Sequence, residues 1–338
     1  MADLLGKLVK TGFIKDTATL DESTLFQNKD VIPTDVPIIN MAFSGDLEGG
    51  LVSGLTTLAG ESKSFKTMLS LYCLKAFQDK YEDSVCLFYD CEFGVTDQYL
   101  KSFGIDTTRI IHIPTYNIED LKFDLMQKLE AIERKDNVFI LVDSLGNMAS
   151  KKEVDDAKDA KAVADMSRAK QIKSLFRIIT PHLVAKDIPA IIIAHIYSSQ
   201  GMFAKNIISG GTGIMYSSNQ AFIITKAQEK TGTEVTGYRF TLTVEKSRFV
   251  KEKSKFPFSV DMNEGINKFS SLMDIALDSG HVVKPSNGWY QKVDMETGEL
   301  IEGKYRLSDT NTTEFWEDIL EEDSFKSYIR SKYQYGNS

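Results

Sequence analysis

The segment Gly60-Glu-Ser-Lys-Ser-Phe-Lys66-Thr67 decides the fold class, because it separates a short apolar strand from a helix. Residues 55–59 predict the strand, and residues 68–77 predict a helix with apolar side chains recurring on one face. A polar loop in this context is typical of a P-loop, in which backbone N–H groups at the start of a helix hold phosphates. Lys66 then reaches the β- and γ-phosphates of ATP, and the Thr67 hydroxyl binds Mg²⁺.

Every residue of this loop is a candidate for nucleotide binding. They are Gly60, Glu61, Ser62, Lys63, Ser64, Phe65, Lys66 and Thr67. Phe65 stands where the GxxxxGK(S/T) pattern has its second glycine, which serves close backbone approach and unusual dihedral angles. Phe65 therefore predicts a modified loop with altered nucleotide affinity. The alternative, a chance helix start rich in serine and lysine, leaves the features downstream unexplained.

Two further strand ends carry carboxylates. Residues 138–142 form an unbroken apolar run that ends at Asp143, the Walker B form, in which a buried strand delivers a carboxylate to the metal beside a P-loop. The strand predicted at 85–89 is followed by Asp90, Cys91 and Glu92. Hydrolysis needs a carboxylate that orients and polarises the attacking water, and Glu92 is the candidate. The alternative for Glu92 is a surface carboxylate in a loop.

Apolar strands alternate with helices along the centre of the chain, which predicts a mostly parallel sheet covered on both faces. Ligands then bind at the carboxyl ends of the strands. The remaining strands are expected at 109–113, 189–194, 221–225 and 240–245, and the remaining helices after Asn117 and at 162–184. Residues 28–55 predict turns and irregular structure, because they are rich in proline and glycine.

The two ends of the chain differ from this centre. Residues 2–15 predict a short amphipathic helix, which packs either on a neighbouring subunit or on its own domain. From about residue 270 a helix at 272–278, a turn-rich stretch and a second helix predict a small α/β domain. We therefore divide the chain into an N-terminal oligomerisation segment (1–27), an ATPase core (28–269) and a C-terminal domain (270–338).

Composition limits the class of protein. A chain of 338 residues, 42% of them apolar, can bury one large core and a smaller one. Its net charge of −8 argues against nucleic-acid binding by overall charge, so any DNA contact must come from local patches. The best patch is 246–255, with five basic residues and one acidic residue, whose alternative explanation is a solvated strand edge.

The distribution of cysteines and histidines argues against metal and disulfide frameworks. The three cysteines form no CxxC pair and the four histidines are scattered, which predicts neither a zinc site nor disulfides and favours a reducing cytoplasm. No apolar run approaches the ~20 residues of a membrane helix, and the first residues lack the pattern of a signal peptide.

These motifs resemble those of RecA-type recombinases. The match rests on the spacing of Gly60–Thr67, Asp90-Cys-Glu92, Tyr99 and Val142-Asp-Ser144, and it is closest to the UvsX recombinases of tailed phages. UvsX proteins share the Ser-Lys-Ser-Phe-Lys loop, so Phe65 departs from RecA and not from UvsX. The resemblance runs over nearly the whole chain. It implies a RecA-like P-loop ATPase core with a mostly parallel central sheet, an N-terminal helix and a small α/β C-terminal domain.

The resemblance also implies roles for single residues. Glu92 corresponds to the family's catalytic glutamate, and Tyr99 to the aromatic residue that stacks on adenine; a buried core tyrosine is the alternative. His195 follows the apolar run 189–194, where RecA has a glutamine that senses the γ-phosphate. Lys246 and Arg248 correspond to the pair of lysines that reaches the ATP of the neighbouring subunit, where an arginine stabilises phosphate charge.

Two segments correspond to the family's DNA-binding loops, at about 147–165 and 196–214. Lysines would hold phosphates, apolar side chains would separate bases, and glycines would let the second loop adapt to DNA. The alternative is a lid over the nucleotide. The candidate DNA-binding residues are Lys151, Lys152, Arg168, Met202, Phe203, Lys205, Gly210 and Gly211.

The function implied is an ATP- and Mg²⁺-dependent recombinase that forms homo-oligomeric filaments on single-stranded DNA and pairs it with double-stranded DNA. A single-strand-binding protein and a loader protein are the expected partners, no membrane is involved, and a phage-encoded chain would work in the host cytoplasm. The alternatives are a hexameric helicase of the same fold, a small-molecule kinase and a DNA-binding scaffold. A helicase needs a ring-closing domain, a kinase needs a lid rich in arginine, and a scaffold needs neither Lys66 nor Glu92.

Overall fold

The computed structural model describes residues 2–14, 17–23, 30–159, 167–198, 206–263 and 265–336. Its helices are α1 (Ala2–Val9), α2 (Pro37–Ser44), α3 (Lys66–Lys80), α4 (Asp97–Ser102), α5 (Ile118–Ala131), α6 (Lys151–Lys158), α7 (Ser167–Ala185), α8 (Thr212–Ser217), α9 (Leu272–Asp278), α10 (Thr313–Glu321) and α11 (Asp323–Tyr333). Its strands are β1 (Gly54–Gly60), β2 (Val85–Asp90), β3 (Ile110–Pro114), β4 (Val138–Asp143), β5 (Pro189–Ser198), β6 (Asn206–Ile208), β7 (Gln220–Thr231), β8 (Glu234–Lys246), β9 (Lys255–Asp261), β10 (Gly265–Ile266), β11 (Val282–Ser286) and β12 (Trp289–Lys292).

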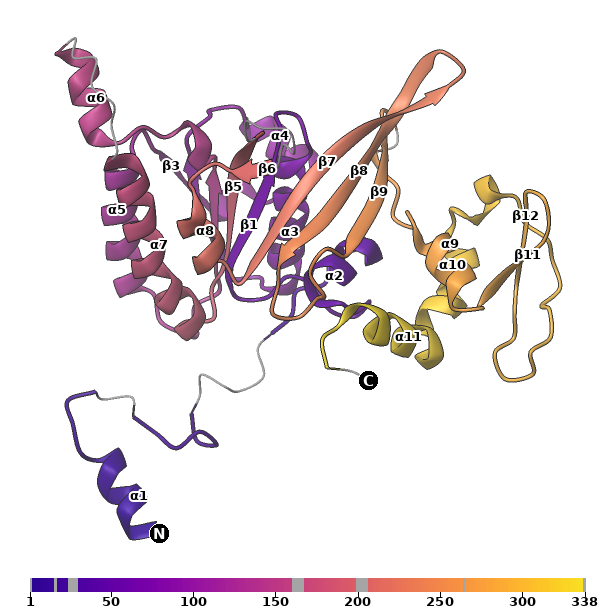
Figure 1. Ribbon diagram of the computed structural model, residues 1–338, viewed down its shortest axis with the longest axis horizontal. Coiled ribbons are helices and arrows are strands. Elements are labelled where there is room, and N and C mark those ends of the chain that lie inside the picture. Colours follow the sequence, from indigo (N-terminus) through magenta and orange to yellow (C-terminus); the bar gives the residue numbers. More distant parts are fainter. Residues whose placement is uncertain are drawn as a thin grey trace.

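One large sheet organises the molecule. Its strand order is β10-β9-β8-β7-β1-β5-β4-β2-β3, with β6 paired to β5. The strands from β7 to β3 in this order run parallel, and β8, β9 and β10 extend the sheet beyond β7, each antiparallel to the strand before it. A small second domain, with the β11–β12 hairpin and helices α9 and α10, lies beside the antiparallel end (Figure 1). The expected α/β fold with a small C-terminal domain is confirmed.

Strands β4 and β5 are apolar over most of their length because their side chains enter two different cores. On β4, Phe139 and Leu141 belong to one buried cluster, while Ile140 and Val142 belong to the other. Helices α5 and α7 cover the face with Ile140, and α2 and α3 cover the opposite face (Figure 1). Alternation along a strand buried on both faces removes any polar period, which is why these strands read as continuous apolar runs.

Helix α2 contradicts the prediction of irregular structure at 28–55. Pro37 occupies the first turn of the helix, where its missing N–H is harmless, and Gly45 ends the helix with a left-handed φ of 73°. Residues from Ile38 to Ser44 are all buried. The helix therefore has no polar face, and because proline and glycine mark its two ends, the sequence of this segment resembles that of a loop.

The segments leaving β4 and β5 are more regular than predicted. Helix α6 lies within 147–165 and begins with a capping box between Ser150 and Glu153. Strand β5 continues through His195 to Ser198 and pairs with β6, so the segment 196–214 is a loop only in part.

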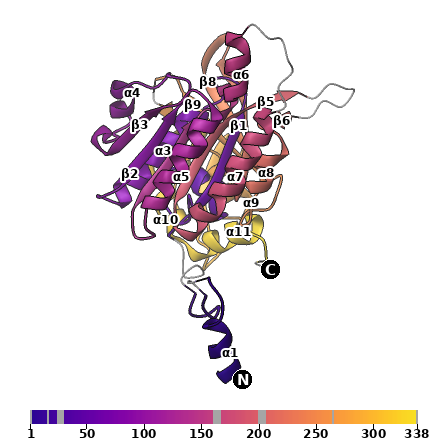
Figure 2. The ribbon, with the colours of Figure 1, turned by 90° about the vertical axis from the view of Figure 1, so that its left-hand side faces the viewer.

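The N-terminal helix lies apart from the sheet (Figures 1 and 2). It ends at Val9, although helix was predicted to residue 15, and Leu4, Leu5 and Leu8 are exposed. These leucines do not pack on the core of their own chain, so packing on a neighbouring subunit stays a prediction. None of the described helices combines the length and apolarity needed to cross a membrane.

Candidate functional site

The phosphate loop leaves β1 at the carboxyl edge of the sheet. Gly60, the last residue of β1, pairs in register with His195 of β5 and Ile224 of β7. Lys66 begins α3, is 6% exposed, and its Nζ donates to the carbonyl oxygens of Gly60 at 3.2 Å and Glu61 at 2.6 Å. Burial lowers the pKa of this ammonium group. The lysine thus folds back over its own loop, with its charge at the place where a P-loop receives phosphate.

Phe65 adopts the conformation that the motif normally assigns to glycine. Its φ is 71°, in the left-handed region that side chains rarely occupy. The ring is nearly buried and packs against Phe240 and Phe258, with ring centroids 5.0 and 5.4 Å apart, and against Tyr72. This aromatic cluster offsets the cost of the backbone conformation, since each ring contributes apolar burial and ring contacts. The loop therefore has a left-handed residue where the motif has its second glycine, and the altered nucleotide affinity stays a prediction.

Thr67 and Asp143 form the next part of the site. The Thr67 hydroxyl donates to Asp143 Oδ2 at 2.7 Å. Asp143 is 4% exposed, its Oδ1 has no hydrogen-bond partner among the described residues, and burial raises its pKa to about 6. An orphaned, buried carboxylate oxygen beside a hydroxyl fits Mg²⁺, which binds few protein ligands and completes its shell with water and phosphate oxygens. Within the described ranges, no group of three or more His, Cys, Asp or Glu side chains could hold a metal by itself.

Glu92 lies between the ends of β4 and β5. Its Oε1 accepts hydrogen bonds from Ser144 Oγ and from Asn147 Nδ2 at 3.0 Å, and lies 3.1 Å from His195 Nε2. Asp90 Oδ1 accepts from the N–H groups of Glu92 and Phe93, which fixes the turn that carries the glutamate. Ser144 and Asn147 were not assigned roles from the sequence. Ser144 directly follows the Walker aspartate, whereas nothing in the sequence pattern distinguishes Asn147.

A cleft of about 470 Å³ joins these groups. Its lining includes the P-loop, Glu92, Asp143, His195 and Tyr99. Tyr99 makes an edge contact with Phe103 at 5.2 Å, and burial raises its pKa. Lys226 also lines the cleft, with its Nζ 3.6 Å from the ring centroid of Tyr238, and was not predicted from the sequence. The residues expected to bind a nucleotide are thus brought together at one edge of the sheet.

Lys246 and Arg248 lie elsewhere. Lys246 pairs with Ala221, which pairs with Thr57 of β1. That position is three residues before Gly60, roughly 10 Å back along the strand at ~3.3 Å per residue. Lys246 Nζ donates to the carbonyl oxygens of Met215 at 2.9 Å and Tyr216 at 2.8 Å, at the end of α8. Arg248 is exposed on the loop that follows. Neither residue lines the cleft of its own chain.

Comparisons with known proteins agree with this arrangement. Residues 15–267 match the family model of the RecA N-terminal domain, and residues 269–329 match the C-terminal domain of the bacteriophage T4 recombination and repair protein. This chain belongs to the RecA family of recombinases. It is 49% identical over 340 residues to the recombination and repair protein of Enterobacteria phage T4, covering 99% of this chain and 87% of the relative. The predicted resemblance to UvsX recombinases is confirmed.

Bacterial RecA proteins are more distant relatives. The chain is 26% identical over 305 residues to RecA of Bifidobacterium breve, covering 88% of this chain and 74% of that one. It is 27% identical over 287 residues to RecA of Bifidobacterium longum, covering 83% and 68%. These two matches each cover more than four-fifths of this chain.

The candidate DNA-binding residues in and just after the first segment, 147–165, differ in exposure. Lys151 and Lys152 are exposed on α6, and Lys152 forms an ion pair with Asp156 at 2.8 Å. Arg168 points inward instead. Its guanidinium donates to the carbonyl oxygens of Leu145 and Gly146 at 3.1 Å and of Met148 at 2.8 Å. Arg168 thus holds the segment that leaves β4, and its contact with DNA stays a prediction.

The second candidate loop is described only at its ends. Gly210 and Gly211 have φ values of 107° and 74° and lead into α8. Only glycine adopts such values without strain. Met202, Phe203 and Lys205 lie outside the described residues.

Proposed function

We propose that this RecA-family chain is a DNA-dependent ATPase that polymerises on single-stranded DNA and promotes homologous pairing and strand exchange with a duplex. It would serve recombination, repair and recombination-dependent replication. One observation carries the proposal: Lys66, Asp143 and Glu92 converge on one cleft at the carboxyl edge of the sheet. Without that convergence, family resemblance alone would not supply the groups that ATP binding and hydrolysis need in one place.

The nucleotide would be bound by the P-loop together with Asp143 and Tyr99. Lys66 would leave the carbonyl oxygens of its own loop to pair with phosphate, a favourable exchange for a buried ammonium group. Thr67 and Asp143 would hold Mg²⁺, which neutralises phosphate charge when it is bound. Tyr99 would stack on the base from the wall of the cleft. The buried Asp143 Oδ1 supports this assignment because it has no partner of its own.

Glu92 would orient and polarise the attacking water, and His195 would link that carboxylate to the DNA-binding segment. The hydrogen-bond distances among Glu92, Ser144 and His195 support this link. The carbonyl of His195 accepts from the N–H of Ser209, just after β6. A change at the γ-phosphate that displaces Glu92 would therefore reach the strand pair next to the second loop.

Lys246 and Arg248 would act on the nucleotide of the adjacent subunit. Their place outside the cleft that holds their own P-loop supports action between subunits. ATP between subunits makes hydrolysis depend on assembly, and a head-to-tail contact of this kind generates an open helical filament. The exposed leucines of α1 are a second candidate contact between subunits.

The division into segments 1–27, 28–269 and 270–338 is part of the same proposal, with DNA bound along the segments 147–165 and 196–214. Base pairing between strands would supply sequence specificity, because the protein would hold phosphates and backbone. A single-strand-binding protein and a loader protein would be the partners in the cytoplasm of a host cell.

ATP hydrolysis with and without single-stranded DNA, at low salt, tests the proposed function. The expected result is strong stimulation by DNA that disappears in a Lys66→Ala protein. Turnover that ignores nucleic acid would contradict the proposal and would redirect attention to small phosphoryl acceptors. Electron microscopy of the DNA-bound protein with a slowly hydrolysed ATP analogue should reveal filaments.

A further inference from the structure

The loop that carries Arg248 is held in place by the end of the chain. Residues 247–254 connect β8 to β9, and the Ser247 hydroxyl accepts from the N–H groups of Phe249 and Val250 at 3.0 Å each. The guanidinium of Arg248 makes no hydrogen bond or ion pair within the described part of the chain. The position of Arg248 therefore depends on what holds this loop.

Main-chain pairing with residues 333–335 holds the loop 247–254 in place. Lys251 N donates to Tyr333 O at 2.8 Å, and Tyr335 N donates to Phe249 O at 3.3 Å, around a bridge between Val250 and Gln334. The side chain of Val250 is fully buried beneath this pairing. Because every bond connects backbone atoms, the loop and the end of α11 move together.

Side chains reinforce the same contact. The Tyr335 hydroxyl accepts from the N–H of Glu252 at 2.9 Å, and Lys251 Nζ donates to the carbonyl oxygens of Ser331 at 2.8 Å and Lys332 at 3.0 Å. These two carbonyls lie in the last turn of α11, where a cation satisfies groups that the helix leaves unpaired. The loop of Arg248 thus completes the C-terminal end of α11.

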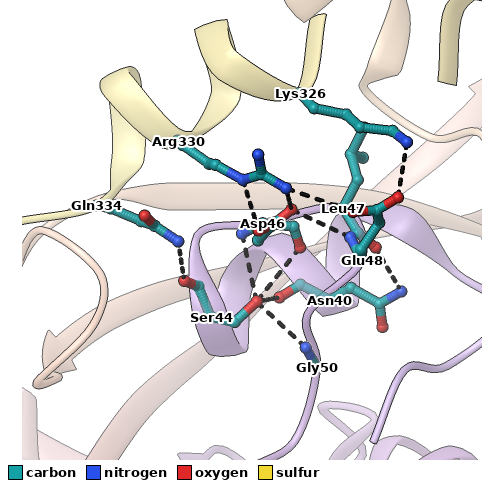
Figure 3. Close-up of polar contacts among 9 residues, drawn as sticks. All are labelled: Asn40, Ser44, Asp46, Leu47, Glu48, Gly50, Lys326, Arg330 and Gln334. Atoms are coloured by element: carbon teal, nitrogen blue, oxygen red, sulfur yellow. Dashed lines mark hydrogen bonds and ion pairs between the residues drawn. The ribbon is translucent and has the colours of Figure 1, made fainter. Parts of the chain in front are cut away.

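Helix α11 is in turn fastened to the turn after α2 (Figure 3). Arg330 Nε lies 2.7 Å from Asp46 Oδ2, Lys326 Nζ lies 2.6 Å from Glu48 Oε1, and Gln334 Nε2 donates to Ser44 O at 3.0 Å. Gln334 packs so closely on Gly45 that an added Cβ there would lie 2.6 Å from its Cγ. Helix α11 therefore bridges the α2 turn of the core and the Arg248 loop.

We propose that α11 and residues 334–335 position Arg248 for the nucleotide of the neighbouring subunit. This inference rests on the proposed role of Arg248 between subunits. A guanidinium that must meet a phosphate across an interface tolerates little displacement, since misplacement by about 1 Å can cost about 10²-fold in rate. The ion pairs of Arg330 and Lys326 thereby influence hydrolysis without contacting ATP. Displacement of α11 slows the hydrolysis of ATP bound between adjacent subunits.

A charge reversal at Arg330 tests this bridge. Arg330→Glu places a third carboxylate beside Asp46 and Glu48, and we expect it to lower the DNA-stimulated kcat about three- to tenfold. The affinity of the DNA-free protein for a fluorescent ATP analogue should not change, because the P-loop is intact. Asp46→Arg in the same chain should restore the rate. Lys304→Glu, an exposed reversal in the same domain, is the matched control and should leave the rate unchanged.

A double-mutant cycle with Arg248→Ala separates positioning from general destabilisation. If the bridge acts through Arg248, Arg330→Glu lowers the rate no further in the Arg248→Ala protein. Equal losses in both backgrounds would overturn positioning while leaving the role of Arg248 intact. Full activity of Arg248→Ala alone would overturn both that role and this inference.

Tyr335→Phe keeps the test decisive if Arg330→Glu does not fold. It removes only the hydroxyl that accepts from Glu252 N. We expect a loss of about twofold in DNA-stimulated kcat, absent in the Arg248→Ala background. A Tyr335→Phe protein with the wild-type rate, or with the same loss in both backgrounds, would contradict the proposal.

Discussion

The RecA-like core and the C-terminal domain both bury ionisable side chains, but they differ in how those side chains find hydrogen-bond partners. In the core, Asp143 is 4% exposed and its Oδ1 has no partner among the described residues. In the C-terminal domain, His281 is 2% exposed, and its two ring nitrogens lie 2.9 Å from Ser279 Oγ and 2.8 Å from Ser324 Oγ. Its ring also makes an edge contact with Phe325.

An unpaired buried atom and a fully paired buried ring indicate different roles, a ligand-binding site and a structural contact. A buried polar atom without a partner costs stability, and a protein retains it where a ligand supplies the missing interaction. A buried ring with both nitrogens paired stabilises the domain around it. Substitutions of the cleft residues in the core should therefore cost activity, whereas substitution of the paired His281 should cost stability.

The largest effect is expected from Lys66→Ala. Removing the buried ammonium group should abolish binding of a fluorescent ATP analogue and lower DNA-stimulated hydrolysis by about 10³-fold or more, since Lys66 is the cation proposed to pair with phosphate. The melting temperature should stay the same or rise, because an ammonium group no longer has to be buried. A clear loss of stability would show that Lys66 is structural, like His281.

Glu92→Gln should come next. The amide keeps the size of the side chain but cannot polarise water, so we expect a loss of about 10²-fold in DNA-stimulated kcat with ATP-analogue affinity retained. Glu130→Gln, an exposed carboxylate on α5, is the matched control. Weakened nucleotide binding in Glu92→Gln would assign the glutamate to the binding surface and not to hydrolysis.

His195→Ala should reduce the stimulation of hydrolysis by DNA about tenfold. The substitution removes the contact between Glu92 and the β5–β6 pair, which is about one hydrogen bond to a charged group. His195→Gln should retain most of the stimulation, since an amide N–H can donate to the same carboxylate oxygen. Hydrolysis by the DNA-free protein is the internal reference. Equal rates of His195→Ala and wild type on single-stranded DNA would remove the histidine from the proposed link.

The smallest effect on activity is expected at His281. Burial lowers its pKa below the ordinary value of 6.5, although Glu322 at 3.3 Å opposes that shift. The unfolded chain therefore binds the proton more tightly than the folded chain. The stabilising contribution of neutral His281 is complete above pH 6.5 and is lost as the pH falls through the lower folded pKa.

Thermal unfolding between pH 8 and pH 5 tests this sign, with His281→Gln as the comparison. The melting temperature of the wild type should fall by a few degrees more than that of His281→Gln over this range, roughly what 1 kcal/mol produces in a protein of this size. ATP turnover by the His281→Gln protein at pH 8 should stay within about twofold of the wild-type rate. Parallel pH profiles of the two proteins would show that His281 does not titrate differently on folding.

Local sequence was sufficient for most of the core. The strands β1, β2 and β4 and the helix after Asn117 lie where they were predicted, and β5 begins there, because short apolar runs and an N-terminal cap are local signals. Helix α2 was missed, since a helix buried on all sides has no period to detect. Helix α11 was missed within a stretch expected to contain a single helix.

The candidate site likewise contains features predicted from local sequence and features that only the tertiary structure revealed. The phosphate loop, Asp143 and Glu92 were determined by the sequence alone, because each belongs to a contiguous motif at the end of a strand. Only the tertiary structure decided that Asn147, Ser144 and His195 share one oxygen of Glu92. It also decided that Phe65 is supported by an aromatic cluster, and that α11 holds the loop of Arg248. These contacts join segments up to 103 residues apart at Glu92 and 284 residues apart at Arg330, and no periodicity along the chain records which distant side chains a fold brings within hydrogen-bond distance.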